Sequence, residues 1–336
     1  MERVTCDPMS VLVAFDLEGP LSPQDNAYEV MGRVPRGYEL FERLSCYDDI
    51  LALEGREDYE PGDTLALLVP FLLANGVIEA DVREVSARAV LVPGAARTVQ
   101  ALKDQGLHVV IISTSYCQHA HNIAGRIGIT HDRVACTQLP LDAMRDAVAP
   151  EDQEFVLEVQ ERLLAVSASR EEEINRLCDA FFWSELPRRP LGGLLRQVEV
   201  VGGARKNSAL ARFAERFGIE PSRVVVVGDS ITDFKMLATI EQAGGLAIVF
   251  NGNEYALPYG TCGVASRDLT AILPVIEAFV ENGRSGAQNL IERLAPQPAV
   301  AEGPVYHWLP AQDLNQVLPA HKKFRKLLRG QAAKLG

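Results

Sequence analysis

Four short apolar runs, each followed by polar and turn-forming residues, dominate the hydrophobic pattern of the chain. They cover residues 11–15, 109–112, 224–227 and 246–250. Continuous apolar runs of this length are typical of strands that are buried on both faces of a parallel sheet.

Helical segments separate these predicted strands. Residues 94–105 are predicted to form a helix that ends at Gly106, and residues 207–217 a helix that ends at Gly218. Each helix leads directly into a strand, and a glycine just past the last turn is a common helix stop. The alternation of strand and helix predicts an α/β fold, with a doubly wound parallel sheet of the Rossmann-like kind.

Two mainly helical segments interrupt this alternation. Residues 20–88 are predicted to form a helical cap, and residues 142–190 a second helical insertion. In the insertion, apolar residues recur at helical spacing from Ile174 to Phe181, and ten acids stand against three arginines between Asp146 and Asp179. The expected domains are a catalytic core (1–19, 89–141 and 191–285), the cap (20–88), the acidic insertion (142–190) and a C-terminal appendage (286–336).

The composition fits a globular protein with more than one domain. The chain has 336 residues, of which 47% are hydrophobic and 23% charged, and one domain for roughly 150 residues suggests two. No run of 18 or more apolar residues predicts a membrane span, and the N-terminus lacks the pattern of a signal peptide. Six scattered cysteines without a Cys-x-x-Cys pair argue against a disulfide framework or a zinc site. We therefore expect a cytoplasmic protein.

Charge is distributed unevenly along the chain. The net charge of −12 argues against a general nucleic-acid binder. Residues 321–336, however, hold six Lys or Arg and no acid, which leaves −18 for the remainder. Phe324, Leu327 and Leu328 are spaced as on one helix face, so this basic tail is interpreted as a helix that folds back on the acidic body. Alternatively, it contacts an acidic protein partner or an anionic membrane surface.

Polar side chains follow the predicted strands where ligands bind in open α/β sheets, beyond the carboxyl ends. Four carboxylates, hydroxyl groups and an ammonium group are expected to meet there. They are Asp16 and Glu18 after the first strand, residues 113–115 after the second, Lys206 before the helix that precedes the third, and Asp229 and Asp233 after the third.

This set suits phosphoryl transfer to a carboxylate. Asp16 is the predicted nucleophile, and its attack on an anionic phosphorus centre calls for a hard divalent cation, Mg²⁺. The expected metal ligands are Asp16, Glu18, Asp229 and Asp233, the last directly or through water. Glu18 is also the predicted general acid and base.

The remaining roles leave alternatives open. Ser113, with Thr114, is expected to hydrogen-bond the phosphoryl oxygens, although Thr114 or Ser115 could be the main contact. Lys206 is expected to neutralise the nucleophile and the transferring group, with Arg205 as the competing candidate. Asp16 could instead be a helix cap, but the other motifs argue against that interpretation.

The ordered motifs resemble those of the haloacid dehalogenase-like hydrolase superfamily, in its phosphoserine phosphatase-like branch. They are Asp16-Leu17-Glu18, Ser113, Lys206 and Gly228-Asp229 with Asp233. The resemblance implies a Mg²⁺-dependent phosphohydrolase with an aspartyl-phosphate intermediate. The second acid is usually Asp, whereas Glu18 is similar to the residue in enolase-phosphatases and in homoserine phosphotransferases. Transfer to a second metabolite therefore stays open beside hydrolysis.

A closer resemblance covers most of the chain. The segments 16–20, 112–116, 227–230 and 250–257 look like a largely archaeal group of predicted phosphatases, some of them labelled subunit R of an energy-converting hydrogenase. That label implies an alternative, a non-catalytic or regulatory subunit that docks through its charged surfaces.

A few further residues complete the expectations. The predicted substrate is a small phosphorylated metabolite, and Arg33, Arg36 and Arg43 are candidate cap contacts for it. The histidines, among them His119, show no metal-ligand spacing and are interpreted as structural. Cys117 lacks a paired base and is interpreted as a packing residue.

Overall fold

A seven-stranded sheet forms the centre of the protein, which is represented by a computed structural model that describes residues 10–295 and 303–334. The strand order is β3-β2-β1-β4-β5-β6-β7, with all neighbours parallel except β7, which runs antiparallel to β6. The strands are β1 (Leu12–Phe15), β2 (His108–Tyr116), β3 (Val134–Thr137), β4 (Val224–Gly228), β5 (Leu246–Phe250), β6 (Cys262–Ala265) and β7 (Val305–Trp308).

The doubly wound parallel sheet predicted from the sequence is confirmed. The four predicted strands are β1, β2, β4 and β5, of which β2 is longer than expected. The three remaining strands were not predicted because each has only four residues and little apolar contrast.

Helices cover both faces of the sheet, as the continuous apolar strands require. In β1, Val13 and Phe15 face one apolar cluster, whereas Leu12 and Ala14 face the other. Because successive side chains of a strand point to opposite faces, both sets must be buried. The first face is covered by α5 (Ala95–Asp104), α6 (Cys117–Arg126) and α13 (Leu273–Leu294, kinked at Asn282 and Gly283), and the second by α11 (Gly203–Phe217) and α12 (Phe234–Gln242).

The helical cap and the acidic insertion form one body with a shared apolar core. Phe71 of the cap, for example, lies with its ring centre 5.6 Å from that of Phe181 of the insertion. The cap holds α1 (Asn26–Met31), α2 (Gly37–Glu54), α3 (Thr64–Ala74) and α4 (Glu79–Ala87). Beyond β3 follow α7 (Leu141–Arg145), α8 (Pro150–Ala165), α9 (Glu171–Asp179), the π-helix Ala180–Glu185 and α10 (Pro190–Leu195).

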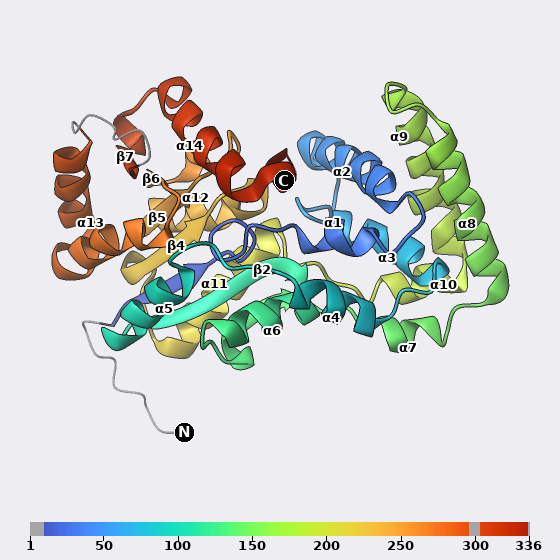
Figure 1. Cartoon of the computed structure of the whole chain (residues 1–336), viewed down its shortest axis with the longest axis horizontal. Helices are drawn as coiled ribbons and strands as arrows, with labels where there is room; N and C mark the ends of the chain where they lie inside the picture. The colour runs from blue at the N-terminus through green and yellow to red at the C-terminus, as the bar shows by residue number, and fades with distance from the viewer. Residues whose placement is uncertain (1–9, 296–302, 335–336) are drawn as a thin grey trace.

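The C-terminal appendage belongs to the core and not to the cap. Its strand β7 extends the sheet, and its helix α14 (Leu314–Arg329) packs on β6. Figure 1 shows the sheet with its helices on the left and the helical body on the right, with the C-terminal end of the chain at their boundary. Short 3-10 helices complete the structure: His131–Arg133, Leu186–Arg188, Pro221–Arg223, Ile231–Asp233, Leu257–Tyr259, Leu269–Ile272, Leu309–Ala311 and Gly330–Lys334.

Within the described residues, no single helix is long and apolar enough to cross a membrane. The bent pair α3 and α4 passes such a test together, but α3 is largely buried in the protein. The five described cysteines are free thiols. Cys6, the N-terminal segment 1–9 and the connection 296–302 lie outside the described residues.

Candidate active site

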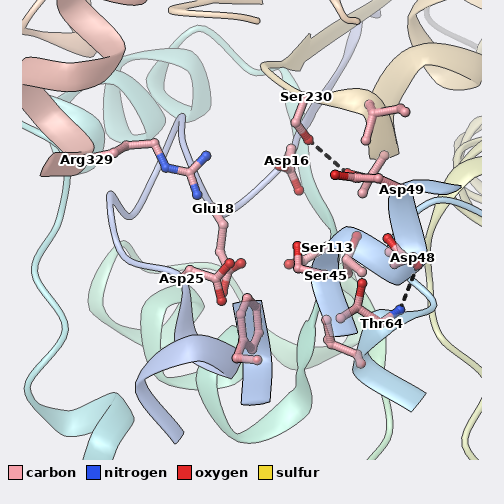
Figure 2. A pocket seen from close by; sticks show the side chains of 16 residues that line it. Asp16, Glu18, Asp25, Ser45, Asp48, Asp49, Thr64, Ser113, Ser230 and Arg329 are labelled. Atoms are coloured by element: carbon pink, nitrogen blue, oxygen red, sulfur yellow. Dashed lines mark hydrogen bonds between the residues drawn. The ribbon is translucent and has the colours of Figure 1, made fainter. Parts of the chain in front are cut away.

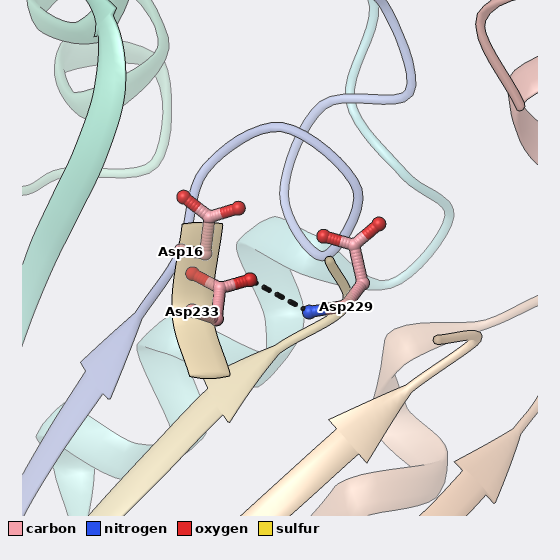
Figure 3. Close-up of side chains that lie close together, drawn as sticks. All are labelled: Asp16, Asp229 and Asp233. Atoms are coloured by element: carbon pink, nitrogen blue, oxygen red, sulfur yellow. Dashed lines mark hydrogen bonds between the residues drawn. The ribbon is translucent and has the colours of Figure 1, made fainter. Parts of the chain in front are cut away.

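Three aspartates meet where β1 and β4 end, as Figure 3 shows. The two strands pair in parallel, with Phe15 opposite Val227, so the residues that follow them lie side by side. The backbone N–H of Asp16 donates to the carbonyl oxygen of Val227 at 2.8 Å. Asp233 closes the loop after β4, because its Oδ2 accepts hydrogen bonds from the backbone of Asp229 at 2.9 Å and of Ser230 at 3.1 Å.

Lys206 joins two of these carboxylates from the first turns of α11. Its Nζ donates to Oδ1 of Asp16 and to Oδ1 of Asp233, each at 2.7 Å, and its side chain is fully buried. Burial alone would lower the pKa of Lys206, but the two carboxylates raise it above its ordinary value. Burial and then the neighbouring Asp233 raise the pKa of Asp16 to about 7, against the opposing effect of Lys206. The ammonium group therefore compensates charge that the protein interior would otherwise disfavour.

The competing candidate for this position lies elsewhere. Arg205 pairs with Asp63 and with the carbonyl oxygen of Val200, on the side away from Asp16. Because successive helix residues point in different directions, only one of the two neighbours can reach the strand ends.

Ser113 and Thr114 lie at the same edge of the sheet and line the cavity in front of Asp16. The Ser113 hydroxyl is buried and accepts a hydrogen bond from the backbone N–H of Ser115 at 3.1 Å. Ser115 is not among the residues that line the cavity. The structure thus brings the two expected phosphate contacts to the site.

The three aspartates offer the chemistry of a divalent cation site. One carboxylate oxygen from each of Asp16, Asp229 and Asp233 lies within 4.8 Å of the others. Oδ1 of Asp229 is buried and has no hydrogen-bond partner, which leaves it available to a metal. Carboxylate oxygens are the ligands that Mg²⁺ prefers, so the residues fit this ion.

The structure does not place the Glu18 carboxylate with the other three expected metal ligands. Its Oε1 accepts a hydrogen bond from the backbone N–H of Asn26 at 3.0 Å and lies 3.9 Å from Nε2 of His119. It stands outside the cluster of three aspartates.

Glu18 has the environment of a general acid. Burial, followed by the negative charge of Asp25, raises the pKa of Glu18 to about 8. Burial lowers the pKa of the adjacent His119 to about 3, so this imidazole is neutral at pH 7. Its Nδ1 lies 3.0 Å from the Ser86 hydroxyl. The sequence interpretation treated His119 as structural, and its spacing carries no signal that would have placed it beside Glu18.

A cavity extends from Asp16 and Ser113 to the helices of the cap, as Figure 2 shows. Arg329 is the one cationic side chain among the described residues that line it. The cap side contributes hydroxyl groups, carboxylates and apolar groups from α2, α3 and the turn before α1: Asp25, Phe41, Ser45, Asp48, Asp49, Thr64 and Leu65.

The cap arginines predicted to contact the substrate do not line this cavity. Arg33 pairs with Glu84 at 2.8 Å, and Arg36 pairs with Glu39 at 2.8 Å. Arg43 donates to the carbonyl oxygen of Val166 at 2.8 Å. Each of the three is thus engaged in a contact within the helical body, and the structure does not bring these arginines to the cavity as predicted.

Comparison with known proteins agrees with this geometry. Residues 13–153 match the family of haloacid dehalogenase-like hydrolases. A gene product of Archaeoglobus fulgidus of known structure is 33% identical, with a TM-score of 0.86 over 97% of this chain and 99% of its own. The chain belongs to the haloacid dehalogenase-like hydrolases.

More distant relatives are proteins named phosphoserine phosphatase. A protein named phosphoserine phosphatase from Albidiferax ferrireducens is 22% identical over 268 residues, which cover 79% of this chain and 89% of that protein. A substrate-bound phosphoserine phosphatase structure is 18% identical, with a TM-score of 0.53 over 80% of this chain and 98% of its own. That structural likeness concerns the fold.

Proposed function

We propose that this hydrolase is a Mg²⁺-dependent phosphatase that transfers the phosphoryl group of a small phosphorylated metabolite to Asp16. One observation carries the proposal: Lys206 bridges Asp16 and Asp233 in the same buried edge where Asp229 keeps a free carboxylate oxygen. The relatives named phosphoserine phosphatase support action on a phosphate monoester.

In the first step, a carboxylate oxygen of Asp16 forms a bond to phosphorus, and the bond from phosphorus to the ester oxygen breaks. The leaving oxygen needs a proton. With a pKa of about 8, raised chiefly by burial, Glu18 holds one at neutral pH. Donation of that proton to the leaving oxygen, which departs as the alcohol, leaves Glu18 ionised and Asp16 phosphorylated.

In the second step, the ionised Glu18 takes a proton from a water molecule as the water oxygen attacks phosphorus. Inorganic phosphate leaves, Asp16 is restored as a carboxylate, and Glu18 is again protonated. Throughout, Lys206 keeps Asp16 oriented by a bond of 2.7 Å to one of its oxygens, and the hydroxyl of Ser113 lies where it can donate to a phosphoryl oxygen.

When bound, Mg²⁺ neutralises charge between the carboxylates and the phosphoryl group. Asp16 and Asp229 are the residues that would hold it, with Asp233 directly or through water. His119 lies beside Glu18 and is neutral at pH 7, so it adds no positive charge that would favour loss of the Glu18 proton.

The cap supports a small substrate. Side chains from α2 and α3 close the cavity over the strand ends, which excludes water during transfer. Carboxylates such as Asp48 and Asp49 on the cap side favour a leaving group with hydroxyl or amino groups over one with a second anionic group.

A panel of small phosphate esters, with p-nitrophenyl phosphate, tests the proposal. We expect Mg²⁺-dependent release of phosphate from the wild-type protein and at least a thousandfold loss in Asp16→Asn. Asp104→Asn serves as the control, because Asp104 is an exposed acid at the end of α5. Turnover that acceptor alcohols stimulate would indicate phosphotransfer. A folded, metal-loaded protein that is inert toward every ester would favour the non-catalytic docking subunit.

A further inference from the structure

The C-terminal helix brings two arginines into contact with the predicted metal site. Arg325 Nη1 donates to Oδ2 of Asp229 and to its carbonyl oxygen, the latter at 3.3 Å. Arg329 Nη1 donates to the same Oδ2 at 2.9 Å. The two side chains are only 3% and 6% exposed. The basic tail is thus a helix folded back on the body, and two of its cations are part of the active-site edge.

Helix α14 is anchored to the core by buried side chains and a hydrogen bond. Val317 and Phe324 are buried against the core. His321 is fully buried, and its Nδ1 accepts a hydrogen bond from the backbone N–H of Gly252 at 3.1 Å. Together with β7 at the sheet edge, these contacts make the helix a structural part of the core.

The three aspartates of the predicted metal site are paired with cations. Lys206 contacts Asp16 and Asp233, and Arg325 and Arg329 contact Asp229. Glu18 and Asp25 line the same cavity as Arg329. A phosphate dianion that enters this cavity is repelled by these carboxylates, and a guanidinium group beside them offsets part of that repulsion.

The two arginines differ in what else they face. Arg325 also donates to the carbonyl oxygen of Ala333 and does not line the cavity, so it positions Asp229. Arg329 lines the cavity, and its buried Nε has no hydrogen-bond partner. Figure 2 shows its guanidinium group pointing from α14 toward Glu18 and the cavity. A guanidinium group with unused donors is well shaped to bind phosphate.

We propose that Arg329 is a ligand of the phosphoryl group, so that the C-terminal helix completes the active site. The inference rests on the proposed function, because it takes the anion bound by Arg329 to be the phosphoryl group of a phosphate ester. The arginine would accompany Ser113 and Lys206, and from the core side it would add positive charge to a cavity to which the cap contributes carboxylates.

Binding of inorganic phosphate to the full-length protein, measured by calorimetry at saturating Mg²⁺ and again in EDTA, tests this assignment. We expect Arg329→Gln to weaken phosphate binding about tenfold to a hundredfold at saturating Mg²⁺, as for the loss of a charge-assisted hydrogen bond. Arg329→Lys should restore part of the affinity. Lys326→Gln removes the same charge from an exposed position of the same helix, and should stay within about twofold of the wild type.

One result would overturn the assignment, provided that thermal unfolding shows the variants to be folded: wild-type phosphate affinity in Arg329→Gln. If turnover also rose in that variant, Arg329 would be an obstacle in the metal site. Failure of the proposed function looks different: phosphate binding would still depend on Arg329, but no ester would be hydrolysed.

Discussion

Replacement of Lys206 by Ala tests the charge pairing at the centre of the site. The side chain is fully buried between Asp16 and Asp233, with 2.7 Å to each. Its loss would leave two carboxylates in the protein interior without their cation. Breaking a buried ion pair from one side typically costs about 3–5 kcal/mol, which is a large part of the roughly 5–15 kcal/mol that stabilise a folded protein.

Urea unfolding followed by circular dichroism, in EDTA at pH 7, measures this cost. The matched control is Lys235→Ala. Lys235 Nζ lies 2.7 Å from Oε1 of Glu60, but its side chain is 38% exposed, so its removal should cost at most about 1 kcal/mol.

The same unfolding measurement at pH 5 tests whether unpaired negative charge causes the loss of stability. Burial and Asp233 already raise the pKa of Asp16 to about 7. Lys206 opposes this rise, so without it Asp16 takes up a proton still more readily. The unpaired negative charge of Asp16 therefore disappears at pH 5, and the penalty of Lys206→Ala should shrink. A loss at pH 7 no greater than that of Lys235→Ala, or one that does not change with pH, would refute the reasoning.

Three more predictions concern the loop, the acid and the cap. Gly19→Ala should lose activity and several kcal/mol of stability, because φ is +119° and a Cβ would lie 2.4 Å from the carboxylate of Asp229; Gly125→Ala, with open space around it, should not. In a single turnover, Glu18→Gln should slow release of the alcohol about a hundredfold or more with an alkyl phosphate, and should slow release of p-nitrophenol, which needs no proton, much less; equal losses in this first step would contradict its role as the acid. Burial raises the pKa of Asp48 from 3.8 to about 7, so the folded state is penalised increasingly as the pH rises from about 4 to 7. Asp48→Asn should therefore gain stability over the wild type between pH 5 and pH 8, by at most about 4 kcal/mol. A constant difference between the urea midpoints of the variant and the wild type over this pH range would contradict this prediction.

The convergence of the site was predictable because it follows from strand order. Asp16 and Asp229 each come directly after a buried apolar strand, and the carboxyl ends of parallel strands share one edge. Lys206 could be expected near them because it lies in the helix that leads into β4. The short strands β3, β6 and β7 were not predictable, since four residues with mixed polarity carry no periodic signal.

The contribution of the C-terminal helix could not be predicted. Its basic, amphipathic pattern fits a surface helix, a membrane contact or a partner contact equally well. The contact with Asp229 joins residues 96 and 100 positions apart in the sequence. The correction of Arg36, by contrast, had a local signal: Glu39 stands three residues later, where helical side chains meet.

The central claim is that Asp16 accepts the phosphoryl group, and chemical trapping tests it most directly. The protein is mixed with Mg²⁺ and an ester that it hydrolyses, quenched during turnover and reduced with borohydride, which converts an acyl phosphate to an alcohol. Peptide mass spectrometry then locates the modified residue. The account predicts homoserine at position 16, absent in EDTA and absent when substrate is omitted. Turnover without modification of Asp16, or modification of Asp229 or Asp233 instead, would contradict it.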